Sequence, residues 1–229
     1  MANKDNASDD TCFVASMGLE AAIQSGKINN HTLRWFAIDC VERGLEREEK
    51  ASQEQACDNS YSAIKTIDGE DYSQCSWSKY RVAEKHAIAI MKDFQKGCAT
   101  EFDVYEAQQL IPGRSIMFHG YGGDDDLGKA VDTLCDCAGQ TCYDSSIKTK
   151  EKVLVISQCL TWEAAKDRLA TEGYGKYPGY HVYDGWEDNA ETNKKRKTTW
   201  EDGKRAEQDV QLIRLGNFFQ QEGENSYQF

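Results

Sequence analysis

Proline is nearly absent from this chain of 229 residues, which has only two, and no long apolar run occurs. With so little proline, long proline-rich linkers are excluded. No stretch approaches the roughly 20 consecutive apolar residues that a membrane-spanning helix requires, so we expect no membrane partner. The first ten residues (MANKDNASDD) lack the apolar core of a secretory signal, so we expect an intracellular protein.

Basic residues are also in the minority, with 27 Lys and Arg against 39 Asp and Glu, a net charge of −12. A protein that binds nucleic acid through its overall charge would be basic, although a few placed donors can still recognise a phosphate. The one basic run comprises Lys194, Lys195, Arg196 and Lys197. Acidic residues flank it, so we interpret it as a surface loop that neutralises its own charge. Contact with nucleic acid or a protein partner, and nuclear import, are the alternatives.

The cysteine count is odd, at nine, and several of these residues fall within apolar or helical runs. The simplest interpretation is a reducing compartment, cytoplasmic or nuclear, in which free thiols act as small hydrophobes. Cys135, Cys137 and Cys142 have a C-x-C-x4-C spacing, which differs from the C-x2-C pattern of zinc sites. We therefore predict no metal ion and no cofactor.

The first half of the chain has the spacing of apolar residues that is typical of helices. Thr100 and Asp103 have the spacing of a capping box, in which each residue satisfies a backbone N–H at the start of a helix. The predicted helices span residues 11–25, 31–50, 77–97 and 100–110.

The second half alternates short apolar runs with helical patterns. Its clearest apolar run is residues 152–157, where four consecutive apolar residues are typical of a strand in a sheet that is covered on both faces. The predicted strands are residues 115–119, 140–143, 152–157 and 180–183, and the predicted helices are 125–137, 161–171 and 204–220. This order predicts a small parallel α/β sheet, and hence an α+β or α/β chain. The predicted division is a helical region at 1–110, an α/β domain at 111–190, and a charged loop with a C-terminal helix at 191–229.

Residues 113–188, about a third of the chain, resemble a BRCT domain. The landmarks that carry the resemblance occur in the family's order. Residues 113–120 look like the first strand with its glycine exit, and Ala138-Gly139 like the turn into the second strand. Residues 152–157 match the apolar third strand, and Trp186 stands where the family places a Trp at the start of its last helix. The resemblance implies a short parallel sheet flanked by helices.

The resemblance also implies a function. BRCT domains are binding modules, often within DNA repair or replication proteins, and their phosphate pocket joins the end of the first strand to a Lys in the second helix. The matching positions here are His119, Gly120 and Lys166, where His119 replaces the family's usual Ser or Thr. An imidazole, a backbone N–H and an ammonium can together bind a phosphate. The implied partner is a phosphorylated protein, or alternatively a DNA end.

Two other functions stay open. The acidic composition and the lack of enzyme motifs permit a structural or interaction subunit of a larger assembly, including a viral one. The glycine-rich loop from His119 to Asp126 permits a nucleotide-using α/β enzyme. No local spacing points to a catalytic triad, so we predict no catalytic residue and favour a binding protein over an enzyme.

Overall fold

The computed structural model describes residues 18–56, 72–111, 126–138, 145–174 and 190–225. Within these ranges the chain forms seven helices and no strand. They are α2 (Leu19–Gln24), α3 (Asn30–Ala56), α4 (Tyr72–Gln95), α5 (Glu101–Gln109), α6 (Asp126–Asp136), α7 (Ser145–Thr171) and α8 (Ala190–Asn225).

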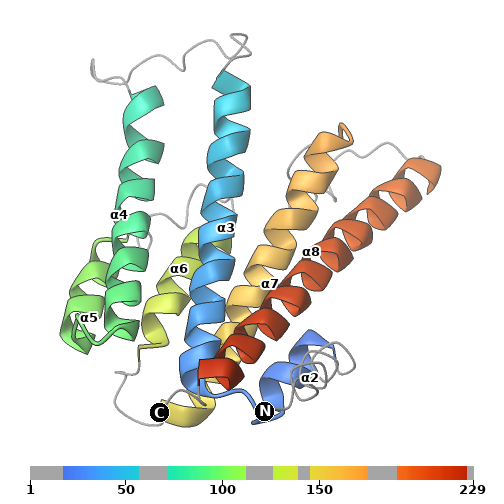
Figure 1. Cartoon of the computed structure of the whole chain (residues 1–229). Coiled ribbons are helices and arrows are strands. Elements are labelled where there is room, and N and C mark those ends of the chain that lie inside the picture. The colour runs from blue at the N-terminus through green and yellow to red at the C-terminus, as the bar shows by residue number, and fades with distance from the viewer. Residues whose placement is uncertain (1–17, 57–71, 112–125, 139–144, 175–189, 226–229) are drawn as a thin grey trace.

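The long helices form two neighbouring antiparallel pairs, α3 with α4 and α7 with α8 (Figure 1). The short helix α6 packs against α3, α4 and α7, and α5 lies at the outer edge against α4 and α6. α7 occupies the centre, because it contacts α2, α3, α6 and α8. A helix with neighbours on so many sides needs apolar residues around most of its circumference.

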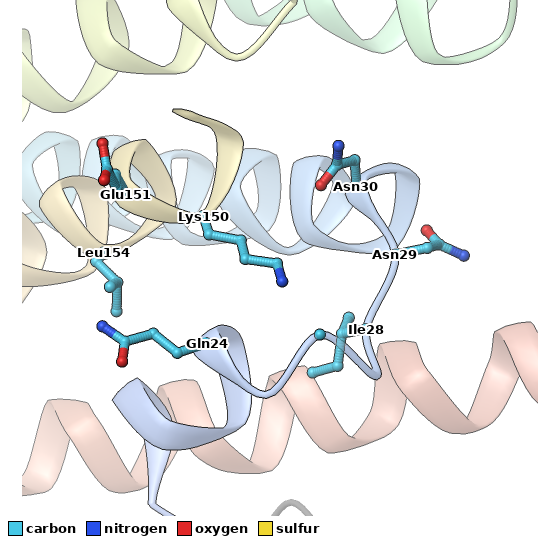
Figure 2. A pocket seen from close by; sticks show the side chains of 8 residues that line it. Gln24, Ile28, Asn29, Asn30, Lys150, Glu151 and Leu154 are labelled. Atoms are coloured by element: carbon cyan, nitrogen blue, oxygen red, sulfur yellow. The ribbon is translucent and has the colours of Figure 1, made fainter. Parts of the chain in front are cut away.

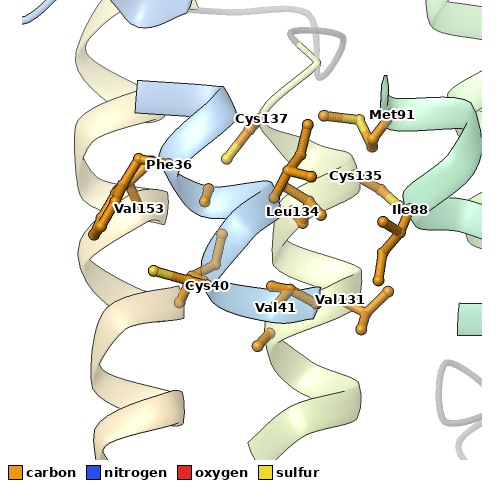
Figure 3. Close-up of a cluster of buried hydrophobic side chains, with 14 of the residues drawn as sticks. Phe36, Cys40, Val41, Ile88, Met91, Val131, Leu134, Cys135, Cys137 and Val153 are labelled. Carbon is orange, nitrogen blue, oxygen red and sulfur yellow. The ribbon is translucent and has the colours of Figure 1, made fainter. Parts of the chain in front are cut away.

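The core joins both halves of the chain. Figure 3 shows Phe36 of α3, Met91 of α4, Leu134 of α6 and Val153 of α7 within one cluster of buried side chains. Four free cysteines are also buried: Cys40, Cys135, Cys137 and Cys159. The interpretation of cysteines as buried free thiols is therefore confirmed at these four positions.

Several predicted helices are confirmed. The patterns at 31–50, 77–97 and 125–137 correspond to α3, α4 and α6, with ends a few residues away. The capping box at the start of α5 is present as predicted. Thr100 Oγ1 accepts a hydrogen bond from the backbone N–H of Asp103, and Asp103 Oδ2 accepts one from the backbone N–H of Thr100 at 2.6 Å. These hydrogen bonds satisfy two N–H groups that the first turn leaves without helical partners.

The predicted α+β or α/β fold is wrong, and so is the BRCT assignment. Residues 152–157, which should form the third strand of the sheet, lie inside the 27-residue helix α7. Thr161, at the start of the predicted helix 161–171, lies in the middle of α7, where its hydroxyl donates to the carbonyl of Ser157 at 2.7 Å. The other predicted strands, at 115–119, 140–143 and 180–183, lie outside the described residues.

Two glycines allow the helices to approach closely. A Cβ on Gly203 of α8 would lie 2.9 Å from the Cα of Ala165 in α7. A Cβ on Gly44 of α3 would lie 2.8 Å from Leu127 of α6. Both contacts are closer than a side chain normally tolerates, so these positions set the distance between neighbouring helices.

Candidate functional site

Lys166, the lysine of the expected phosphate pocket, is held between two carboxylates. Its Nζ donates to Asp126 Oδ2 at 2.7 Å and to Glu163 Oε1 at 3.0 Å, and its side chain is only 14% exposed. Burial alone would lower the pKa of this ammonium, but the bonds and charges of Asp126 and Glu163 raise it overall. A phosphate at Lys166 would have to compete with these two carboxylates for the ammonium. His119 and Gly120 lie outside the described residues, as does the glycine-rich loop before Asp126.

The basic run lies on a helix rather than on the predicted loop. Residues 194–197 belong to the first turns of α8, which begins at Ala190. Lys195 forms an ion pair with Glu191 at 2.9 Å, and the Arg196 guanidinium lies 5.5 Å from the centre of the Tyr174 ring. Lys194 and Lys197 are exposed and form no ion pair with any described residue. Part of the run is therefore neutralised locally, and two ammonium groups face solvent.

α5 presents large apolar side chains to solvent. Phe102 is 63% exposed, Tyr105 is 55% exposed, and Leu110, which directly follows the helix, is 60% exposed. Residues three and four apart share one side of a helix, so these side chains form one face with the exposed Glu106 and Gln109. We call these five residues the α5 face. The opposite side of the helix is buried through Val104, Ala107 and Gln108.

The buried side of α5 is fixed by polar contacts as well as apolar ones. Gln108 Nε2 donates to the carbonyl and side chain of Asp132, each at 3.0 Å, and to Asp136 Oδ1 at 2.8 Å. The two N–H groups of this amide are therefore shared among three acceptors on α6. These bonds fix which side of α5 faces α6, so the exposure of Phe102 and Tyr105 on the other side follows from specific contacts.

A pocket with a volume of about 560 Å³ lies where α2, the start of α3 and the start of α7 meet, across the fold from α5 (Figure 1). Figure 2 shows Lys150 of α7 reaching towards the turn between α2 and α3, beside Ile28 and Asn30. Its lining is Gln24, Gly26, Ile28, Asn29, Asn30, Lys150, Glu151 and Leu154. Lys150 and Glu151 carry opposite charges, so the pocket favours neither cations nor anions. Among the residues that the structure describes, no group of His, Cys, Asp and Glu could hold a metal ion.

Buried polar side chains connect α3, α7 and α8. Glu207 of α8 accepts hydrogen bonds from Arg43 and, at 3.0 Å, from Arg47 Nη1, and both arginines belong to α3. The fully buried Gln211 donates to Glu207 Oε1 at 3.0 Å and accepts from the hydroxyl of Ser157 in α7 at 2.5 Å. The carboxylate and amide of this network are buried between the helices, whereas Arg47 remains partly exposed.

The sequence analysis missed the α5 face. It predicted the helix and its cap, but apolar residues occur on both sides of α5, and periodicity does not say which side the rest of the chain covers. The signal that could have found it is the (i, i+3) pair Phe102 and Tyr105 on a side that lacks basic residues.

Comparison of the chain with models of protein families, with curated proteins and with solved structures finds no match in any of the three. The BRCT resemblance therefore has no support from either the sequence comparisons or the helical fold. No described helix is long and apolar enough to cross a membrane.

Proposed function

We propose that this protein is an interaction subunit of a larger assembly and that it binds a protein partner through the α5 face. The observation that carries the proposal is the exposure of Phe102 and Tyr105 on one side of α5, and of Leu110 directly after it, at the edge of the fold (Figure 1). A single exposed apolar residue is ordinary, whereas a group of them marks an interaction site. Aromatic side chains in particular supply much of the binding energy at protein interfaces.

The surroundings of the α5 face support a protein partner over a membrane surface or a nucleic acid. Residues 101–109 contain three acidic residues and no Lys or Arg. A nucleic-acid surface needs positive charge for its phosphates, and a helix that binds anionic lipids needs basic residues beside its apolar face. An apolar face with carboxylates beside it fits a partner that offers apolar contacts and basic side chains.

The test is site-specific photo-cross-linking in the cells from which the chain comes. A photoreactive phenylalanine analogue replaces Tyr105, and the control places it at Ile213, which is also exposed but lies on α8. We expect an adduct of defined mass from position 105 that is absent from position 213. Replacing Phe102 and Leu110 with serine should abolish that adduct. Equal adducts from both positions, or an adduct unaffected by the serine substitutions, would refute the proposal.

A further inference from the structure

We infer that the partner of the α5 face is the start of α8 in a second copy of this chain, so that copies join head to tail. This inference rests on the proposed function and names the partner for that same surface. The surface on α8 consists of Lys194, Lys195, Arg196 and Lys197, which we call the basic turn.

The charges of the two surfaces are complementary. Within the α5 segment, Asp103 is engaged in the capping box and the charge of Glu101 acts on Arg34, which leaves the exposed Glu106. Within the basic turn, Lys195 already pairs with Glu191, which leaves the ammonium groups of Lys194 and Lys197. In a chain with a net charge of −12, this run of four basic residues stands out, and α5 has no basic residue to oppose it. The repulsion between the negative charges of two copies is screened beyond about 8 Å at physiological ionic strength, so the charges at the contact itself decide which surfaces meet.

The aromatic rings suit cations as well as apolar partners. An ammonium or guanidinium over the face of Phe or Tyr is attracted to the ring, and the apolar stem of a lysine covers apolar surface. Two such contacts occur among the described residues, with the Arg34 guanidinium 5.8 Å from the Phe94 ring centre and that of Arg196 5.5 Å from the Tyr174 ring centre.

The spacing of the groups also matches. Lys194 and Lys197 are three residues apart on α8, and Phe102 and Tyr105 are three residues apart on α5. Each pair therefore lies on one side of its helix, with about 5–6 Å between Cβ atoms. Two helices laid against each other can place one ammonium over each ring. Glu106 follows Phe102 by four residues and lies on the same side, where it can pair with a lysine.

The two surfaces lie on opposite sides of the molecule. In Figure 1, α5 is at the left edge, whereas α8 begins at the right edge, at its orange end. The basic turn therefore cannot reach the α5 face of its own copy. A contact between two different surfaces on separate copies is heterologous, so repetition produces a ring or an open chain of subunits. This arrangement suits a subunit of a larger assembly.

The test blocks one surface at a time in the full-length chain. The first variant carries Phe102→Ser, Tyr105→Ser and Leu110→Ser, and the second carries Lys194→Glu and Lys197→Glu. Sedimentation velocity should show concentration-dependent growth for the wild type and only monomers for each variant alone. Mixing the variants should produce a one-to-one dimer and nothing larger, because each contributes its intact surface. Circular dichroism checks that both variants retain their helices.

A matched control removes exposed apolar side chains elsewhere. Val210→Ser with Ile213→Ser on α8 should assemble like the wild type, because these residues are exposed but lie outside both surfaces. The charge reversal at Lys194 and Lys197 should raise the dissociation constant about tenfold or more, since two attractive contacts are lost and repulsion from Glu106 is added.

The outcomes separate this inference from the proposed function. If the wild type stays monomeric, or if the mixed variants form no dimer, the head-to-tail contact is refuted. The proposed function then still stands if cross-linking at Tyr105 captures a different protein. If the wild type assembles and the variant lacking the three apolar side chains assembles equally well, the head-to-tail contact is refuted too, and an absence of any specific adduct from Tyr105 would then refute the proposed function.

Discussion

Removal of the Glu207 carboxylate should destabilise the protein more than any exposed substitution on α8. The Glu207 side chain is only 6% exposed and is bonded to Arg43, Arg47 and Gln211. In Glu207→Ala, both guanidinium groups lose this partner. Nη1 of Arg43 is already buried without a hydrogen bond, so its guanidinium would be left with little compensation. Breaking a buried ion pair in this way typically costs about 3–5 kcal/mol of unfolding free energy.

The assay is urea unfolding followed by circular dichroism, with a thermal melt alongside. For a chain of this length, the expected loss corresponds to a fall in Tm of roughly 6–20 °C. Asp209→Ala is the matched control, since it also removes one carboxylate from α8 but at an exposed position, and it should change stability by less than about 0.5 kcal/mol. Replacing Arg43 and Glu207 together with Met should cost less than Glu207→Ala, because no unpaired charge is created between them. Equal stability of Glu207→Ala and Asp209→Ala would refute the reasoning.

Three further predictions test other contacts. Gly203→Ala should lower the free energy of unfolding in urea, because the new Cβ would lie 2.9 Å from the Cα of Ala165. The overpacking, about 1–3 kcal/mol, should outweigh the gain of about 1 kcal/mol in helix propensity, and an equally or more stable variant would contradict the close packing. The pKa of Lys166 is raised in the folded protein, so the pairing of its ammonium with Asp126 and Glu163 stabilises the fold fully below the unfolded-state pKa. This stabilisation is lost as the pH rises above about 10.4. The Lys166→Met variant should be less stable than the wild type at pH 7, and its free energy of unfolding should not show this loss at high pH. Brief alkylation of the native protein, followed by peptide mapping, should label the exposed Cys98 and spare Cys137, because burial raises the pKa of Cys137 to about 12; equal labelling would show that Cys137 is accessible.

The strand prediction at residues 152–157 shows where sequence patterns are ambiguous. A short continuous apolar run fits a strand buried on both faces, but it equally fits a helix surrounded by neighbours. α7 is such a helix, so Val153 and Ile156 are fully buried, while Leu154 and Val155 are partly covered. A longer window would have favoured the helix, because the buried positions Thr149, Val153, Ile156 and Leu160 follow a spacing of three and four residues.

The elements with local signals were predictable. The capping box at Thr100 and the amphipathic pattern of α6 depend on neighbouring residues only, and both are found in the structure. The α5 face depends on which side of α5 the distant helices α4 and α6 cover, and no local pattern contains that information. The same limit applies to Lys166, whose carboxylate partner Asp126 lies 40 residues earlier.

The inner side of α8 carries polar residues as well as apolar ones. Val210 and Ile213 are exposed, whereas Gly203, Glu207, Gln211 and Leu215 are among the buried positions of this helix. These four residues recur every fourth position, which places a close backbone contact, a charge, an amide and one leucine along the inner side of the helix.

Such an inner face contributes more to register than to stability. Apolar contacts tolerate sliding, because one leucine substitutes for another, whereas Glu207 is satisfied only opposite Arg43 and Arg47, and Gln211 only opposite Ser157. A shift of α8 by one turn would leave a buried charge without its partner, at a cost of several kcal/mol. The network therefore fixes the position of α8 along the bundle. Because the basic turn belongs to the same continuous helix, its distance from α5 is fixed as well, and a head-to-tail contact between copies requires that fixed separation.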